Sequence, residues 1–187
     1  MPSDKGKTEN AGLSAILEGL INAGIEFILV GGLAAVVQGS PITTMDVDIV
    51  HRQTSENIAK LLDFLKSIDA YHRRLDDKII EPAAEHISGR GHALFTTRFG
   101  PLDVLAIIEE GQSYEDLIDY TVEIELRGHT IRVLDLEMLV KLKKSSKDPK
   151  ENQRLPILEE TLRQLKQEEA SLQETKDTST GDKSDES

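Results

Sequence analysis

Two aspartates in one short hydrophobic stretch are the residues of this chain best suited to chemistry. Asp46 and Asp48 lie on either side of Val47 in the sequence DVDIV, which has the composition of a β-strand. Side chains alternate along a strand, so both carboxylates should project from the same face. Two adjacent carboxylates repel each other, and one takes up a proton unless a cation lies between them. The pair therefore indicates a site for a hard divalent cation such as Mg²⁺, which binds through one or two carboxylates together with substrate phosphates.

A glycine pair upstream supplies the second half of such a site. The apolar run 27–30 stops at Gly31 and Gly32, and a short apolar segment, 33–37, follows. This order predicts a strand, a tight turn and a helix. Free backbone N–H groups at the start of a helix attract anions, so the turn is a candidate phosphate site. Each half alone is more often a plain turn or a solvated strand edge, and only the combination indicates an enzyme-like site.

A third carboxylate belongs to a later pair of strands. Residues 92–98 and 102–108 read as strands on either side of a Gly-Pro turn, which predicts an antiparallel hairpin. Asp103 is the one acidic residue in the otherwise apolar second strand. An aspartate near a turn at a strand start can also be purely structural, so the pattern alone leaves its role open.

The glycine pair, thirteen further residues and Asp-x-Asp in a hydrophobic strand together resemble the signature of the polymerase-β-like nucleotidyltransferase superfamily. The resemblance covers roughly residues 25–165 and is closest to the short single-domain bacterial members, including those of toxin–antitoxin and abortive-infection systems. It implies an α/β (α+β) nucleotidyltransferase fold, with a mixed β-sheet flanked by helices and a C-terminal helical segment. Asp103 matches the third carboxylate, which this superfamily carries on a strand beside Asp-x-Asp.

The resemblance also implies a reaction. A nucleoside monophosphate would move from an NTP such as ATP to a hydroxyl group, with two Mg²⁺ ions held by Asp46, Asp48 and Asp103 as the catalytic and metal-binding residues. The backbone of Gly31 and Gly32 would contact the β- and γ-phosphates. A lysine of the basic helix predicted over 136–146 would also reach the phosphates, and Lys141 is the residue chosen for that role.

Two positions depart from the pattern of the superfamily. Many relatives have a serine in place of Gly32, and its hydroxyl contacts phosphate. Many also have an arginine a few residues before Asp-x-Asp, where this chain has Ile42. Both departures bear on triphosphate affinity, and neither touches the carboxylates.

The composition of the chain argues against several classes of function. The net charge of −12 argues against a broad basic surface for nucleic acid, and the absence of cysteine excludes disulfides and thiolate metal sites. The N-terminus lacks the apolar core of a signal peptide, and no segment reaches membrane-spanning length, so a cytoplasmic protein without membrane contact is expected. The predicted organisation is a disordered tail over 1–10, a nucleotidyltransferase-like domain over 11–166, and a disordered acidic tail over 167–187.

The elements expected outside the motif follow from apolar periodicity and turn residues. Residues 69–91 show no clear pattern. The expected elements are helices over 13–24, 55–68, 114–120, 136–146 and 155–165 and a hairpin over 121–134, with Thr54 or Ser55 capping the second helix and Pro156 in the first turn of the last.

Two functions remain open from the sequence. The leading hypothesis is an active Mg²⁺-dependent nucleotidyltransferase whose acceptor is a protein, a tRNA end or a small molecule. The alternative is a binding module on the same fold, for example an antitoxin that neutralises a partner through its surface. Three carboxylates that converge on one point favour the enzyme, because a pure binder has no need of them.

Overall fold

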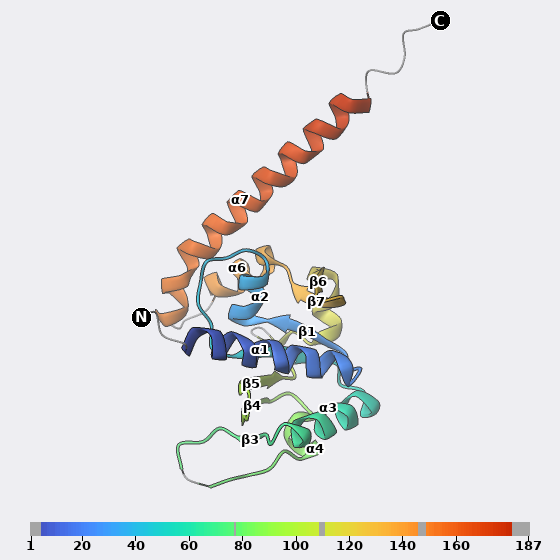
Figure 1. Cartoon of the computed structure of the whole chain (residues 1–187), viewed down its shortest axis with the longest axis vertical. Coiled ribbons are helices and arrows are strands. Elements are labelled where there is room, and N and C mark those ends of the chain that lie inside the picture. Colours follow the sequence, from blue (N-terminus) through green and yellow to red (C-terminus); the bar gives the residue numbers. More distant parts are fainter. Residues whose placement is uncertain (1–4, 77, 109–110, 146–148, 181–187) are drawn as a thin grey trace, which may run out of the picture.

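The computed structural model describes residues 5–76, 78–108, 111–145 and 149–180. Within these ranges the strands form a mixed seven-stranded sheet in the order β3-β4-β5-β2-β1-β7-β6, with helices packed around it (Figure 1). The predicted fold class is confirmed. The strands are β1 (Phe27–Val30), β2 (Val47–His51), β3 (Tyr71–His72), β4 (His92–Thr97), β5 (Gly100–Leu105), β6 (Thr121–Leu126) and β7 (His129–Leu134). The helices are α1 (Lys5–Asn22), α2 (Gly31–Val37), α3 (Ser55–Ser67), α4 (Ala84–Ile87), α5 (Tyr114–Leu117), the 3₁₀ helix η2 (Ile118–Tyr120), α6 (Leu136–Ser145) and α7 (Pro149–Thr180).

Three central strands carry the motif residues. β2 runs antiparallel to β1 and parallel to β5, and its register places Asp48 opposite Val30 on one side and Asp103 on the other. Both predicted hairpins are present, because β4 pairs with β5 and β6 pairs with β7 in antiparallel fashion. The second strand of the first hairpin ends at Leu105, three residues earlier than predicted.

The two faces of this part of the sheet differ in chemistry. On one face the side chains are buried, and they include Phe95, Leu102 and Val104, each at most 1% exposed. Helix α1 contacts β2 and β5 and also packs on α3. Leu94 lies on the opposite face, directly across from Asp103, and is 38% exposed. The covered face is the core, and the opposite face is left open for the carboxylates.

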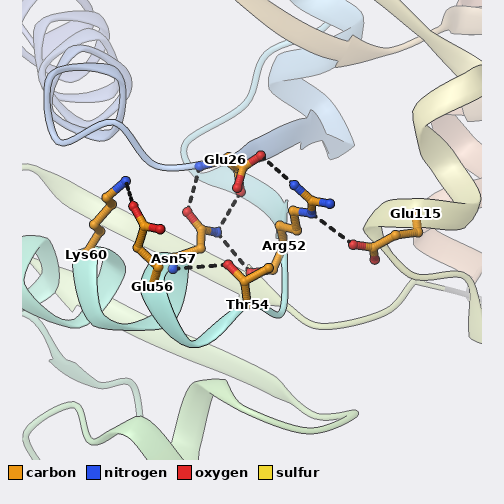
Figure 2. Close-up of polar contacts among 7 residues, drawn as sticks. All are labelled: Glu26, Arg52, Thr54, Glu56, Asn57, Lys60 and Glu115. Carbon is orange, nitrogen blue, oxygen red and sulfur yellow. Dashed lines mark hydrogen bonds and ion pairs between the residues drawn. The ribbon is translucent and has the colours of Figure 1, made fainter.

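A group of polar contacts joins α3 to the start of β1 and the end of β2 (Figure 2). The Thr54 hydroxyl caps α3 as predicted and accepts a hydrogen bond from the Asn57 backbone N–H at 3.2 Å. The buried Asn57 side chain accepts from the backbone N–H of Glu26 at 2.7 Å and donates to the carbonyls of Glu26 and Arg52, each at 2.9 Å. Arg52 in turn pairs with Glu26 and Glu115. Apolar periodicity did not identify Asn57 as a buried residue, because its burial depends on these backbone partners.

Both ends of the described chain are more helical than the sequence indicated. α1 begins at Lys5, and α7 runs from Pro149 to Thr180, so residues 5–10 and 167–180 are helical although disorder was expected there. Residues 167–174 of the last segment read QEEASLQE and are mostly Glu, Gln, Ala and Leu, which favour helix even without packing. Residues 1–4 and 181–187 lie outside the described residues.

The start of α7 is a further correction. The last helix does not begin near Leu155 with Pro156 in its first turn, because Pro156 lies inside a helix that already starts at Pro149. Leu155, Leu158 and Leu162 all contact the core, and these contacts hold the helix through the proline. In Figure 1 the second half of α7 projects away from the sheet. Among the described residues no helix is both long and apolar enough to cross a lipid bilayer.

Within the segment 69–91, which showed no clear pattern, β3 forms one edge of the sheet. β3 pairs with β4, and α4 packs against the same region. The ring nitrogens of His72 and His86 lie 2.8 Å apart and join the two elements.

Candidate active site

The three predicted carboxylates converge. Asp46 lies immediately before β2, Asp48 within β2, and Asp103 opposite Asp48 on β5. One carboxylate oxygen of each lies within 4.8 Å of one from each of the other two. Mg²⁺ binds oxygens at about 2.0–2.1 Å, so small side-chain rotations bring all three onto one ion.

The carboxylates carry more negative charge than their surroundings neutralise. The pKa of Asp48 is raised to about 7, mainly by burial and then by the charges of Asp46 and Asp103, against the opposing effects of Lys143 and Arg73. Burial also raises the pKa of Asp103, although the Arg73 guanidinium holds it down. The cluster consists of hard oxygen donors that are partly removed from water, and one of its carboxyl groups has a raised pKa. These properties fit a divalent cation of the Mg²⁺ class.

The glycine turn lies directly against this cluster. Gly31 has a φ of +68°, which favours glycine, and a Cβ there would overlap the carboxylate of Asp48. A Cβ at Gly32 would lie 2.7 Å from the Thr44 hydroxyl. Val30, the residue before α2, provides no side-chain hydrogen bond to cap this helix start.

Thr44 connects the turn to the first carboxylate. Its hydroxyl donates a hydrogen bond to Oδ1 of Asp46 at 2.7 Å, while its side chain packs beside Gly32. This contact orients Asp46, which lies outside the strand and needs another support. Nothing in the local sequence distinguishes Thr44 from neighbouring Thr43.

The lysine of α6 that acts on the cluster is Lys143. Its charge lowers the pKa of Asp48, and its side chain is half-buried. Lys141 is exposed, and none of the described contacts joins it to the carboxylates. Side chains two residues apart on an α-helix point in roughly opposite directions, so the two lysines cannot both face Asp48.

Two arginines from distant segments complete the surroundings. The guanidinium of Arg154, on α7, lies over the glycine turn, because a Cβ at Gly32 would be 3.6 Å from its Nη1. Arg73, which follows β3, pairs with Asp103 at 2.5 Å. Neither arginine belongs to a recognisable motif, and sequence reasoning did not identify them.

Comparison with known proteins agrees with this geometry. A family model described as aminoglycoside-2''-adenylyltransferase matches residues 12–158. No curated protein sequence matches the chain. The fold is similar to that of the lincosamide antibiotic adenylyltransferase LnuA, solved with lincomycin bound, with a TM-score of 0.54 and 16% identity over 80% of this chain and 95% of that one. It is also similar to that of ANT(2'')-Ia in complex with adenylyl-2''-tobramycin, with a TM-score of 0.50 and 13% identity over 79% of this chain and 85% of that one.

Proposed function

The chain belongs to the aminoglycoside-2''-adenylyltransferase family of polymerase-β-like nucleotidyltransferases, and from this premise we propose that it transfers AMP from ATP to a hydroxyl group of a small molecule. The observation that carries the proposal is the convergence of three carboxylates beside a glycine turn. A small-molecule acceptor is supported by the antibiotics named with the two structural neighbours. The choice of a hydroxyl group as the acceptor follows from the reaction that is typical of the superfamily.

The proposed metal ligands are Asp46, Asp48 and Asp103. Their donor set fits Mg²⁺, and these three carboxylates would hold the metal beside the reacting groups. When bound, the metal neutralises the triphosphate and lowers the pKa of the acceptor hydroxyl. Thr44 keeps Asp46 in position for this role through its 2.7 Å hydrogen bond.

The triphosphate lies, in this proposal, at the glycine turn. The backbone of Gly31 and Gly32 contacts the β- and γ-phosphates, and the missing side chains let the phosphates come close. Arg154 supplies a cation over the turn and offsets the absence of an arginine at position 42. Lys143 is the α6 lysine whose charge reaches the cluster, and Lys141 remains a second candidate on the same helix.

The protein contributes little covalent chemistry to such a transfer. The acceptor oxygen forms a bond to the α-phosphorus, the bond from this phosphorus to the pyrophosphate breaks, and the hydroxyl proton is released. The side chains position the reactants and balance charge, which is the main way in which phosphoryl-type transfers are accelerated.

Label transfer from α-³²P-ATP tests the proposal. The wild-type protein with Mg²⁺ should label a component of a small-molecule extract, and ATP with Mg²⁺ should raise its melting temperature. Asp48→Asn removes one metal-binding charge at constant size. Because metal stabilisation of developing charge is worth several kcal/mol and each 1.4 kcal/mol is about tenfold, transfer should fall several hundred-fold or more.

The matched control is Asp63→Asn, the same change at an exposed position on α3. It should transfer label like the wild type. Equal transfer by Asp48→Asn would refute the catalytic assignment. Wild-type protein that neither transfers label nor is stabilised by any NTP with Mg²⁺ would instead favour the binding module.

A further inference from the structure

Two histidine rings join the edge strand β3 to α4, directly before the arginine that pairs with Asp103. His72 ends β3 and His86 lies in α4, and their rings meet edge to face with centroids 4.4 Å apart. Nε2 of His72 lies 2.8 Å from Nδ1 of His86. Because β3 has only two residues, few backbone hydrogen bonds hold it on the sheet, and this ring contact adds to them.

The start of α4 determines which ring carries the shared proton. The backbone N–H of Ala83, just before α4, donates a hydrogen bond to the same Nδ1 of His86 at 3.1 Å. A ring nitrogen that accepts this bond carries no hydrogen, so His86 is neutral with its proton on Nε2. The proton between the rings therefore belongs to Nε2 of His72, which donates it to His86. One acceptor thus serves two donors.

An additional proton does not fit this arrangement. On Nδ1 of His86 it would break both hydrogen bonds, because three donors would then point at one another. On Nδ1 of His72 it would leave the bonds intact, but burial and then the charges of His86 and Arg74 lower the pKa of His72. The joined rings therefore bind fewer protons in acid than two separated histidines, and acid favours their separation.

No acidic side chain lines the hollow of about 380 Å³ that the two rings share, so no carboxylate there would stabilise a protonated ring. The other lining residues are basic or apolar: Arg73, Arg74, His92, Ile80 and Leu94. The charged groups on the neighbouring segments have partners of their own or are exposed: Asp103 pairs with Arg73, Asp76 with Arg74 and Glu56 of α3 with Lys60, and Glu85 of α4 is exposed.

Arg73 connects this contact to the candidate active site. It follows His72 directly, and its backbone N–H donates to the carbonyl of Leu94 at 2.8 Å. Leu94 in turn pairs with Asp103 across the sheet, so the three residues lie in one row. Neighbouring strands are about 4.8 Å apart, and the Arg73 side chain spans two such steps to reach Asp103 at 2.5 Å. The position of this guanidinium therefore depends on β3 staying on the sheet.

We propose that His72 and His86 form an acid-sensitive latch, which holds Arg73 on Asp103 near neutral pH and releases it when His86 takes up a proton. The latch is a property of the fold, and its effect on catalysis rests on the nucleotidyltransferase function proposed above. On release β3 leaves the sheet while α4 stays in place, because Ile87 of α4 is 2% exposed and its carbonyl lies 2.8 Å from Nε2 of buried His51. Acid thus removes one cation from the carboxylate cluster without unfolding the domain.

Amide hydrogen exchange at about pH 7.5 and about pH 5.5 tests the latch. The amides of Ala83 and Arg73 report on its two sides, because each donates one of the hydrogen bonds described. Their protection factors, which are corrected for the intrinsic effect of pH on exchange, should fall together in the wild type. Histidine has an ordinary pKa of about 6.5 and one proton is worth tenfold per pH unit, so protection should be about tenfold lower at the acidic pH.

His86→Asn separates protonation from loss of the contact. The Oδ1 atom of asparagine takes the place of Nδ1 and accepts both hydrogen bonds, but it does not titrate. This variant should keep the protection of Ala83 and Arg73 at both pH values, whereas His86→Ala, which has no acceptor, should show low protection at both. The control is His129→Asn, the same change at an exposed histidine of β7, which should behave like the wild type.

The ¹⁵N chemical shifts of the imidazole rings check the assignment of the protons. At about pH 7.5, His86 should carry its hydrogen on Nε2, and a hydrogen on Nδ1 would overturn the latch. Equal protection of the wild type at both pH values, or a parallel loss in the wild type and in His86→Asn, would overturn it as well. These measurements use neither nucleotide nor metal, so their failure would leave the nucleotidyltransferase function standing, and absence of label transfer would leave the latch standing.

Discussion

At the scale of single residues, the surroundings of Asp48 explain its raised pKa. Its carboxylate is largely removed from water and has two other carboxylates as neighbours, so its pKa rises from 3.8 to about 7. The same surroundings that make the metal-free anion unfavourable make a divalent cation favourable. Residues that bind a metal are in this way held in a state that costs stability until the metal arrives.

The pH dependence of stability tests this account. The pKa of Asp48 is higher in the folded protein than in the unfolded chain, so the stabilisation by its proton is complete below about pH 4 and is lost as the pH rises through about 7. At pH 8 without metal, Asp48→Asn should therefore be more stable than the wild type, by up to about 4 kcal/mol at 1.36 kcal/mol per pKa unit. Near pH 5 most of this advantage should disappear. Urea unfolding at both pH values measures the difference.

Comparison of these two proteins cancels the titration of every other group, including buried His51, whose pKa is lowered by burial. Mg²⁺ at pH 8 should stabilise the wild type more than Asp48→Asn. An Asp48→Asn protein that is less stable than the wild type at pH 8 would show that this carboxylate is a structural hydrogen-bond acceptor and not a metal ligand held under strain.

At the scale of elements, the turn between β1 and α2 is where chain geometry and chemistry coincide. Gly31 takes a left-handed conformation, which turns the chain at the end of β1 and starts α2 at once. Its α-carbon lies so close to Asp48 that no side chain fits between them. A side chain at Gly31 would therefore occupy the space that the Asp48 carboxylate fills.

Two glycine substitutions separate strain from crowding. Gly39→Ala also meets a positive φ, of +94°, but its Cβ would have no atom within 4 Å. It should lose only the cost of a left-handed conformation, about 1–2 kcal/mol. Gly31→Ala should lose more, and it should also lose stabilisation by ATP and Mg²⁺, because Asp48 must move. Urea unfolding and thermal shift measure the two effects, and equal behaviour of the two variants would contradict this crowding of Asp48.

At the scale of the whole molecule, the two halves of α7 differ in how far their side chains pack on the domain. Its first half packs on the domain: Leu158 is 2% exposed, Lys144 pairs with Glu159, and Lys166 pairs with Glu137. Beyond Lys166 the described side chains, through residue 173, are all exposed. Among the described side chains, packing on the domain therefore ends near Leu165 while the helix continues, and a domain boundary at residue 166 stays a prediction.

Truncation tests this boundary. A chain that ends at Lys166 should melt within about 2 °C of the full chain, because exposed residues contribute little to stability. Leu158→Ala is the contrasting change and should cost about 2–5 kcal/mol, since it leaves a cavity in the core. A large fall in melting temperature on truncation, at all protein concentrations, would show that residues 167–187 pack on the domain. A fall that depends on concentration would show that they hold together two copies of the chain.

The sequence by itself determined the local part of this protein. Gly31, Gly32, Asp46 and Asp48 lie within one strand–turn–helix–strand unit, and such short-range order follows from apolar periodicity and turn residues. The hairpins were predictable for the same reason, but the turns predicted at Gly-Pro and Gly-His lie slightly earlier, at residues 98–99 and 127–128, because Gly100 and His129 already pair in the strands. Asp103 needed one further step, the resemblance to a superfamily, since nothing local says which strand lies beside β2.

Only the tertiary structure decided which cations and supports surround the carboxylates. Arg73, Lys143 and Arg154 come from three segments that are far apart in the chain. The sequence pattern around a surface arginine or lysine does not indicate which carboxylate it will contact. The burial that raises the pKa of Asp48 likewise depends on what covers the strand and not on the strand itself. Asn57 is inside for a related reason: its three backbone partners exist only after β1, β2 and α3 have met. Local sequence fixes the conformation of each segment, whereas desolvation and charge pairing arise between segments and are set when they pack.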